Sequence, residues 1–286
     1  MESRVHTIAG PSLKLAPFGD LQYGAEGCDV EKARRHIQFG IEHDWRFVGM
    51  GDYIDFASPS SRFKIETAGA YEIVTNTLED AAQAYIKRAY EEVFQGSEGR
   101  WLGIVEGHHF WPLRNGPHPH TDYVLADQLK TEFLGTTGHL SIFIGDCPRP
   151  LVVHFTHGDR SSVTTTGTIA HLERLKRDWD FDILLVGHNC KKYGIPYDYM
   201  RTTVFKDTQP DGSWKWKSHV VADTRIIAQT GGFMRGYIEG SHDGPFIRGS
   251  YVERRMLPPI PTGGMLIEIR PVQEDWGWRM DMFVSA

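Results

Sequence analysis

Five short apolar segments in this chain each end in a small residue that is followed at once by aspartate or histidine. Short apolar runs bounded by glycine are typical of buried β-strands. The polar ends read Gly19-Asp20, Gly51-Asp52, Gly107-His108-His109, Thr156-His157 and Gly187-His188. Ligands in layered α/β folds bind outside the carboxyl ends of the strands, so we expect these ends to converge on one place.

The segments between these ends indicate the fold class. Strands and helices alternate in the first half, and the last third has mostly strand character, which favours an α/β sandwich with mixed sheets. The 286 residues suit one domain, which we place at residues 1–286 with a loop-rich insertion at about 231–264. We predict strands over 13–18, 46–50, 101–105, 140–144, 151–155, 181–186, 197–205, 219–227 and 265–269, and helices over 30–41 (capped by Asp29), 78–93, 122–132 and 169–175.

Charge and cysteine content bound the partners and the compartment. The net charge of -6 argues against a protein that binds nucleic acid mainly by neutralising phosphates, because such proteins are usually basic. Cys28, Cys147 and Cys190 show no paired spacing, so we expect no disulfide framework and a reducing, cytoplasmic compartment. No apolar run approaches the roughly 18 residues of a membrane span, and the charged N-terminal segment does not resemble a signal peptide. We therefore expect no membrane partner.

Aspartate and histidine placed after glycine are well suited to binding a metal ion. Carboxylates and neutral imidazoles are ligands for zinc, manganese and iron, and a preceding glycine lets the backbone turn sharply towards the ion. The ordered set resembles the calcineurin-like metallophosphoesterase superfamily, whose pattern runs D-x-H, GDxxD, GNH, a later HG and GHxH. Here the same order reads DLQ, GDYID, GHH, THG and GHNC, over about residues 13–190. The resemblance implies a layered αββα sandwich with two mixed β-sheets and a metal site at the strand carboxyl ends.

The resemblance also implies a role for each position of the pattern. Two divalent ions, manganese, zinc or iron, would lie side by side, with Asp52 bridging them. His109 would be the catalytic acid that protonates the leaving oxygen, and Asp55 would order its own loop. The remaining ligands implied are Asp20, Gln22 and Cys190 for the first ion, and His108, His157 and His188 for the second.

Several positions depart from the family pattern. Gln22 and Cys190 replace two histidines of the first metal site, so we expect that site to bind its ion weakly or with a different selectivity. His108 replaces an asparagine, which is expected to strengthen the second site. Phe110 replaces an acidic residue after the catalytic histidine, so another group must orient His109.

The resemblance implies hydrolysis at phosphorus by a dinuclear metal centre and a metal-bound hydroxide. We expect a phosphodiesterase or nuclease-like enzyme with a phosphoester substrate, for which nucleic acid and nucleotides are candidates. A phosphomonoesterase acting on proteins or nucleotides stays open, as does a non-catalytic scaffold with a degraded metal site. Arg114 is a candidate for phosphate contact, because a guanidinium fork matches phosphate oxygens. His154, which precedes the metal motif on its strand, is expected to be an ordinary core residue.

Overall fold

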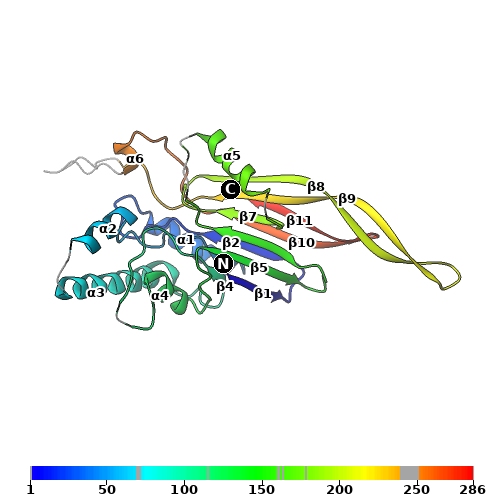
Figure 1. Ribbon diagram of the computed structural model, residues 1–286, viewed down its shortest axis with the longest axis horizontal. Helices are drawn as coiled ribbons and strands as arrows, with labels where there is room; N and C mark the ends of the chain where they lie inside the picture. The colour runs from blue at the N-terminus through cyan, green and yellow to red at the C-terminus, as the bar shows by residue number, and fades with distance from the viewer. Residues whose placement is uncertain are drawn as a thin grey trace.

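Two β-sheets packed face to face, with helices on their outer faces, make up the computed structural model of this chain (Figure 1). The structure describes residues 2–68, 72–114, 116–159, 162, 164–177, 179–238 and 251–285. Both sheets contain parallel and antiparallel strand pairs. The predicted layered αββα sandwich with two mixed β-sheets is therefore confirmed.

Each sheet combines a run of parallel strands with additional strands at its edges. The six-stranded sheet has the order β1 (Glu2–Ile8), β5 (Thr137–Ile144), β6 (Leu151–Thr156), β7 (Ile183–Val186), β9 (Trp214–Thr230) and β8 (Lys192–Thr208). The five-stranded sheet has the order β11 (Gly277–Ser285), β10 (Leu266–Glu274), β2 (Leu13–Phe18), β3 (Arg46–Gly49) and β4 (Trp101–Ile104). Strands β2, β3 and β4 are parallel, as are β6, β7 and β9, so their carboxyl ends lie together in each sheet.

Helices cover the outer faces of the sheets unequally. The five-stranded sheet is covered by α1 (Val30–Glu42), α3 (Glu72–Ala89) with its π-helical continuation η1 (Tyr90–Phe94), and α4 (Thr121–Gln128). The six-stranded sheet carries α5 (Thr165–Leu175), and the shorter α2 (Pro59–Thr67) and α6 (Tyr251–Arg254) lie in connections. Asp29 caps α1 as predicted, because its Oδ1 accepts a hydrogen bond from the Lys32 N–H at 3.1 Å.

Three apolar layers follow from this arrangement. The central layer packs β2 against β6, with Leu15 and Phe155 both fully buried. A second layer lies under α1, where Ile37 is 1% exposed. A third, smaller layer packs Leu172 of α5 on Leu184 of β7. The alternation of side chains along each strand thus divides residues between the central layer and an outer face.

The predicted strands all occur, and several elements lie beyond the prediction. Strands β1 and β11 and helix α2 were not predicted, and α3 begins at Glu72 rather than at residue 78. The helix predicted over 122–132 ends at Gln128. In the loop-rich stretch 231–264, the described residues are mostly loop apart from α6, and 239–250 lie outside the described residues. Among the helices that the structure describes, none is both long and apolar enough to cross a membrane.

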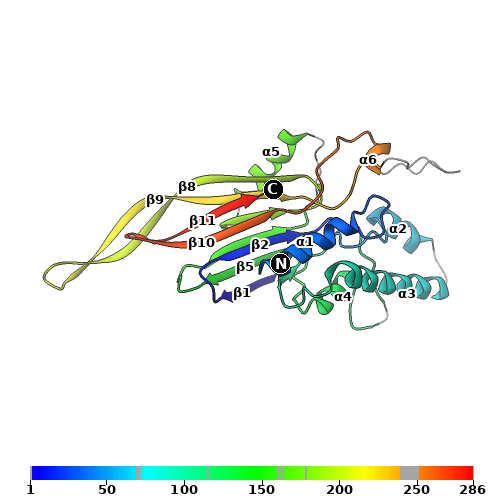
Figure 2. The ribbon, with the colours of Figure 1, turned by 180° about the vertical axis from the view of Figure 1, so that it is seen from behind.

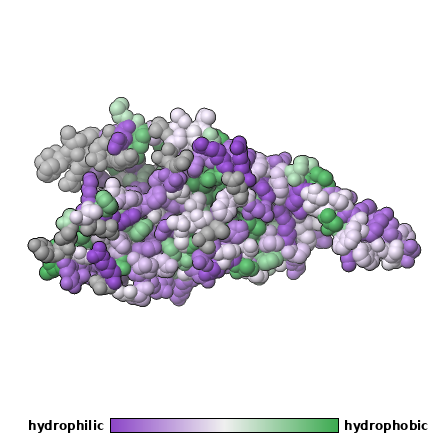
Figure 3. Space-filling view, viewed as in Figure 1, coloured by the Kyte–Doolittle hydropathy of each residue, from purple (hydrophilic) through white to green (hydrophobic). Residues whose placement is uncertain are grey.

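The β8–β9 hairpin is longer than the predicted strands 197–205 and 219–227. Each of its strands has 17 residues, and they pair continuously from Lys192 with Thr230 to Thr208 with Trp214. Its outer half extends past the neighbouring strands (Figures 1 and 2), and in Figure 3 it projects as a narrow arm of interspersed hydrophilic and apolar side chains. Because β9 is parallel to β7, the tip of the hairpin lies at the end of the sheet opposite the strand-end motifs.

Candidate metal centre

The predicted strand ends from both sheets meet at one place. The loops after β2 and β3 run side by side, since the Asp20 N–H donates to Gly51 O at 3.0 Å and the Gln22 N–H donates to Asp52 O at 2.8 Å. The loop after β7 joins them across the sheets, because the His188 N–H donates to Asp20 Oδ2 at 2.9 Å. Convergence of the strand ends, expected from the motifs, is thus present in the structure.

Two overlapping groups of side chains at this meeting point could hold metal ions. The first comprises Asp20, Asp52 and His157, and the second comprises His108, His157 and His188. Within each group the ligand atoms lie within 4.8 Å of one another. His157 belongs to both groups, and its Nε2 lies 3.2 Å from Asp52 Oδ2. The structure therefore brings together five of the residues that the sequence motifs named.

Buried acceptor atoms without partners give a direct test of whether a cation fits here. Asp20 Oδ1, Asp52 Oδ2 and His157 Nε2 are buried and form no hydrogen bond of standard geometry among the described residues, although Asp52 Oδ2 and His157 Nε2 lie 3.2 Å apart. The Nδ1–H of His157 donates to Met50 O at 2.7 Å, which leaves Nε2 directed at the carboxylates. An unpaired buried polar group costs about 1–3 kcal/mol, and carboxylate and imidazole acceptors are suitable ligands for divalent ions. The residues present thus fit a bound divalent cation.

The pKa values of Asp52 and His157 also show that positive charge is stabilised at this meeting point. Burial alone would raise the pKa of Asp52, but the neighbouring His157 outweighs it and holds that pKa below its ordinary value. Burial alone would lower the pKa of His157, but the Asp52 carboxylate raises it to about 9. The proton on His157 therefore occupies the place where a metal ion would supply the positive charge.

The other two histidines of the second group are in the form that ligates metals. Burial, together with the charge on His157, lowers the pKa of His188 to about 4 and also lowers that of His108. The Nδ1 atoms of His108 and His188 face each other at 3.3 Å. Neutral imidazole is the metal-binding form, so these two rings are ready to share an ion at neutral pH.

The backbone around the centre is strained at the predicted positions. Asp20, Gln22, Asp52, His188 and Cys190 all have positive φ angles, between 49° and 68°. A left-handed conformation at a non-glycine residue costs of order 1–3 kcal/mol and clusters at functional sites. Five such residues in three loops indicate that the fold maintains this geometry for the site rather than for its own stability.

Close approach of the loops explains one of the glycines in the motifs. Gly107 packs so tightly that an added Cβ would collide with the backbone nitrogen and Oδ1 of Asp52. That Oδ1 also accepts hydrogen bonds from the backbone N–H groups of His108 and His109, the latter at 3.1 Å. One oxygen of Asp52 therefore fixes the histidine loop, while Oδ2 is left for an ion.

The surroundings of Asp20 differ from those of the histidine group. Burial raises the pKa of Asp20 to about 7 and raises that of the Cys190 thiol well above its ordinary value. The thiol is hydrogen-bonded to the Asp20 carboxyl, and Cys190 lies outside both ligand groups of the described residues. Gln22 joins the centre through its backbone N–H. Ligand roles for Gln22 and Cys190 remain predictions.

His109 has the partner that its sequence context lacks. Its Nδ1 lies 2.6 Å from Asp55 Oδ1, and its Nε2 lies 4.0 Å from Asp52 Oδ2. Burial opposes the charged ring, but the Asp55 and Asp52 carboxylates together raise the pKa of His109. Asp55 was expected to order its own loop, and it instead contacts the ring of His109, which has no acidic residue beside it at Phe110. The second aspartate of the GDYID motif was the feature of the sequence that could have indicated this contact.

Arg62 of α2 contacts the site although none of the motifs indicated it. Its Nη1 donates to the carbonyl oxygens of Ala57, His108 and Phe110 at 3.0, 2.6 and 2.7 Å. The guanidinium also lies 4.1 Å from the centre of the Phe110 ring. Arg62 thus holds the loop that presents both histidines, and no apolar periodicity in α2 would have revealed it.

Arg114 is placed differently from the rest. It is exposed, in the connection between β4 and α4, and it is absent from the described lining of the groove that adjoins the centre. Contact of Arg114 with a phosphate stays a prediction.

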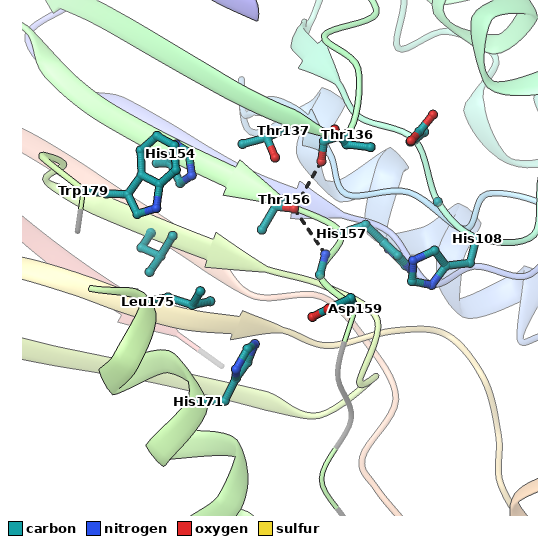
Figure 4. A pocket seen from close by; sticks show the side chains of 14 residues that line it. His108, Thr136, Thr137, His154, Thr156, His157, Asp159, His171, Leu175 and Trp179 are labelled. Atoms are coloured by element: carbon teal, nitrogen blue, oxygen red, sulfur yellow. Dashed lines mark hydrogen bonds between the residues drawn. The ribbon is translucent and has the colours of Figure 1, made fainter. Parts of the chain in front are cut away.

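A groove leads away from the metal centre (Figure 4). Its volume is about 340 Å³, and it runs along the outer face of the six-stranded sheet beside α5. His108 and His157 line its inner end, and His154 and Trp179 line its outer end. His154 is buried as expected, but it forms part of the groove wall rather than of the core. A substrate held at the centre therefore has room on one side.

Comparisons with known proteins add little to this geometry. No family model matches the chain, and no curated protein matches it. Among solved structures, Vacuolar Protein Sorting 29 from Cryptosporidium parvum matches with a TM-score of 0.38 and 12% identity, over 96% of this chain and 98% of that chain. A single mutant of Vps29 from Entamoeba histolytica matches with a TM-score of 0.37 and 11% identity, over 96% and 100% of the two chains. Vps29 from Chaetomium thermophilum gives 0.30 and 9%, over 96% and 97%. Function must therefore be argued from the site.

Proposed function

We propose that this chain is a metal-dependent phosphoester hydrolase of the calcineurin-like kind, acting on diesters as a phosphodiesterase or nuclease-like enzyme. The observation that carries the proposal is the set of buried acceptors without partners, Asp20 Oδ1, Asp52 Oδ2 and His157 Nε2. They face one another beside the neutral imidazoles of His108 and His188. Positive charge stabilises these acceptors, and a bound divalent cation would supply more of it than the proton on His157 does.

The second ion would be held by Asp52, His108, His157 and His188. The first would be held by Asp20 and Asp52, with Gln22 and Cys190 as the weaker contributors. Bound divalent ions supply Lewis acidity towards a phosphoryl oxygen and lower the pKa of a water molecule. Carboxylate with imidazole suits manganese, zinc or iron, and the histidine-rich second group is the stronger of the two.

We assign His109 the role of donating the proton that the leaving oxygen requires, which its contacts support. Asp55 holds Nδ1 at 2.6 Å, which fixes the ring plane and leaves Nε2 as the proton-carrying atom on the side of Asp52. The carboxylates raise the pKa of His109, so its ring holds a proton nearer neutral pH than an isolated imidazole does. General acid catalysis by such a group contributes about 10²–10⁴ in rate.

A non-catalytic, metal-binding scaffold is the second candidate, and one observation favours it. The Asp20 carboxyl and the Cys190 thiol are hydrogen-bonded to each other, and burial raises both pKa values, to about 7 for Asp20. An ion at the first site must displace protons from this pair. If it cannot do so, the second ion alone would remain, without the clamp on phosphate that two ions provide.

Metal-stripped protein titrated with Mn²⁺, Zn²⁺ or Fe²⁺ separates the candidates. We expect metal-dependent turnover of a nitrophenyl phosphodiester, slower turnover of the matching monoester, and loss of most turnover in His109→Ala with metal content retained. Faster turnover of the monoester would favour a phosphomonoesterase. Stoichiometric metal binding without turnover of either ester would favour the scaffold.

A further inference from the structure

The outer end of the groove has an aromatic wall. Trp179 stacks on His154 with ring centroids 4.2 Å apart and an interplanar angle of 23°. Trp179 is 39% exposed, so part of its indole is available to a ligand. His154 is 3% exposed and lines the groove, yet its Nδ1 has no hydrogen-bond partner among the described residues. The exposed part of the Trp179 indole is a flat surface that suits stacking by a planar ring.

The charges along the groove disfavour a substrate that carries a second anionic group away from the metal centre. The described lining includes the carboxyl groups of Glu106 and Asp159 and contains no lysine or arginine. Burial, with the nearby His139, lowers the pKa of His154 to about 4, so this ring adds no positive charge at neutral pH. The part of a substrate that enters the groove is therefore uncharged, which disfavours a second phosphate or an acidic peptide.

Distances along β6 indicate how much of a substrate would fit. His154 and His157 are three residues apart, which is about 10 Å along an extended strand. That separation is comparable to the span from the phosphorus of a nucleotide to the far edge of its base. The volume of about 340 Å³ lies near the lower limit of the roughly 300–1,000 Å³ of small-molecule pockets.

We infer that this groove binds the nucleoside part of a phosphoester, with the base against Trp179 and His154 and the phosphate at the metal centre. The inference rests on the proposed function, because the metal centre fixes where the phosphate lies. It names the substrate class as a nucleotide or a nucleic-acid end rather than a phosphoprotein or a sugar phosphate. The base is recognised by stacking on Trp179, whose indole rests on the buried ring of His154.

Calorimetric titration of metal-stripped protein with adenosine tests this directly, since adenosine carries no phosphate and needs no ion. Ribose is the matched ligand without a base. Trp179→Ala removes the stacking surface, and His154→Phe keeps a ring against Trp179 while removing the unpaired nitrogen. Trp216→Ala is the control for loss of a surface tryptophan. Trp216 lies on the distant hairpin, and its side chain is 61% exposed.

We expect adenosine to bind the parent protein and Trp216→Ala equally, and Trp179→Ala to bind about tenfold more weakly or worse, as for loss of one base-stacking aromatic. His154→Phe retains a ring under Trp179 and is expected to bind adenosine about as well as the parent protein, and ribose is expected to show no binding. Three results would overturn the inference: no adenosine binding to the parent protein, equal binding by Trp179→Ala, or equal affinity for ribose. Adenosine binding without metal-dependent turnover would instead refute the proposed function and leave the groove assignment standing.

Discussion

Replacing Asp55 with asparagine isolates the role of the His109–Asp55 pair. The 2.6 Å contact between His109 Nδ1 and Asp55 Oδ1 is a charge-assisted hydrogen bond, a class worth about 1.5–3 kcal/mol. Both side chains are partly exposed, at 23% and 33%, so solvent screening favours the lower end of that range. A loss of about 1.4 kcal/mol in the transition state corresponds to roughly tenfold in kcat.

The assay compares two phosphodiesters that differ in leaving group. Nitrophenolate leaves readily without a proton, whereas an unsubstituted phenolate needs one, so Asp55→Asn should slow the phenyl ester more than the nitrophenyl ester. The carboxylate raises the pKa of His109, and the acid form is lost as pH rises through that pKa. Removing the carboxylate therefore moves the alkaline limb of the pH–rate profile to lower pH. Asp55 belongs to neither ligand group, so metal content is expected to stay unchanged.

Equal slowing of both esters, or loss of metal from Asp55→Asn, would refute this reasoning. The first result would mean that His109 donates no proton to the leaving oxygen. The second would mean that Asp55 supports the metal centre rather than the catalytic ring. Asp55→Glu is a useful companion, because it keeps the charge but displaces the oxygen that meets Nδ1.

Other predictions follow from the same contacts. Asp52→Asn is expected to lower both metal content and turnover, and unchanged metal by elemental analysis would contradict its bridging position. Cys190→His should tighten the first site in a Zn²⁺ titration, and unchanged affinity would show that this position is no ligand. Arg62→Ala should cost about 1.5–3 kcal/mol in urea unfolding, against no change in the exposed control Arg35→Ala. Since burial lowers the pKa of His154 to about 4 from 6.5, the unfolded chain gains a proton first as pH falls. The pKa values of His36, His120 and His188 are lowered in the same way, so His154 accounts for only part of the stability lost between pH 7.5 and 5, and His154→Phe should reduce that loss by about 2 kcal/mol.

The strand-end motifs predicted that Asp20, Asp52, His108, His157 and His188 converge, because each motif depends on local sequence. Gly51-Asp52 and Gly187-His188 follow short apolar runs, and the positive φ angles of Asp52 and His188 show why the chain turns there. Parallel strands then bring the ends together without further information from the sequence. The same reasoning predicted the central strands, whose apolar composition reflects burial on both faces.

Contacts between distant segments could not be predicted in the same way. Arg62 contacts backbone carbonyl groups of a loop 46 residues away. Every residue has a backbone carbonyl, so the sequence does not indicate which ones Arg62 contacts. His154 was expected in the core, but the central layer takes its neighbours Val153 and Phe155. Strict alternation along β6 then places His154 on the opposite face, where Trp179 covers it. Recognising this required the position of α5 and the segment after it.

The length of the β8–β9 hairpin affects how its backbone hydrogen bonds open locally. Near Thr230 its strands are held by β7 and by the central apolar layer, whereas from Trp214 to His219 every residue of β9 is exposed. An isolated two-stranded ribbon is marginally stable in water, so its hydrogen bonds can open without the rest of the sheet. Hydrogen exchange is therefore expected to show a gradient along one continuous pair of strands. Amides near the tip should exchange through fraying, and those near Ile226 and Ala228 only when the whole protein unfolds.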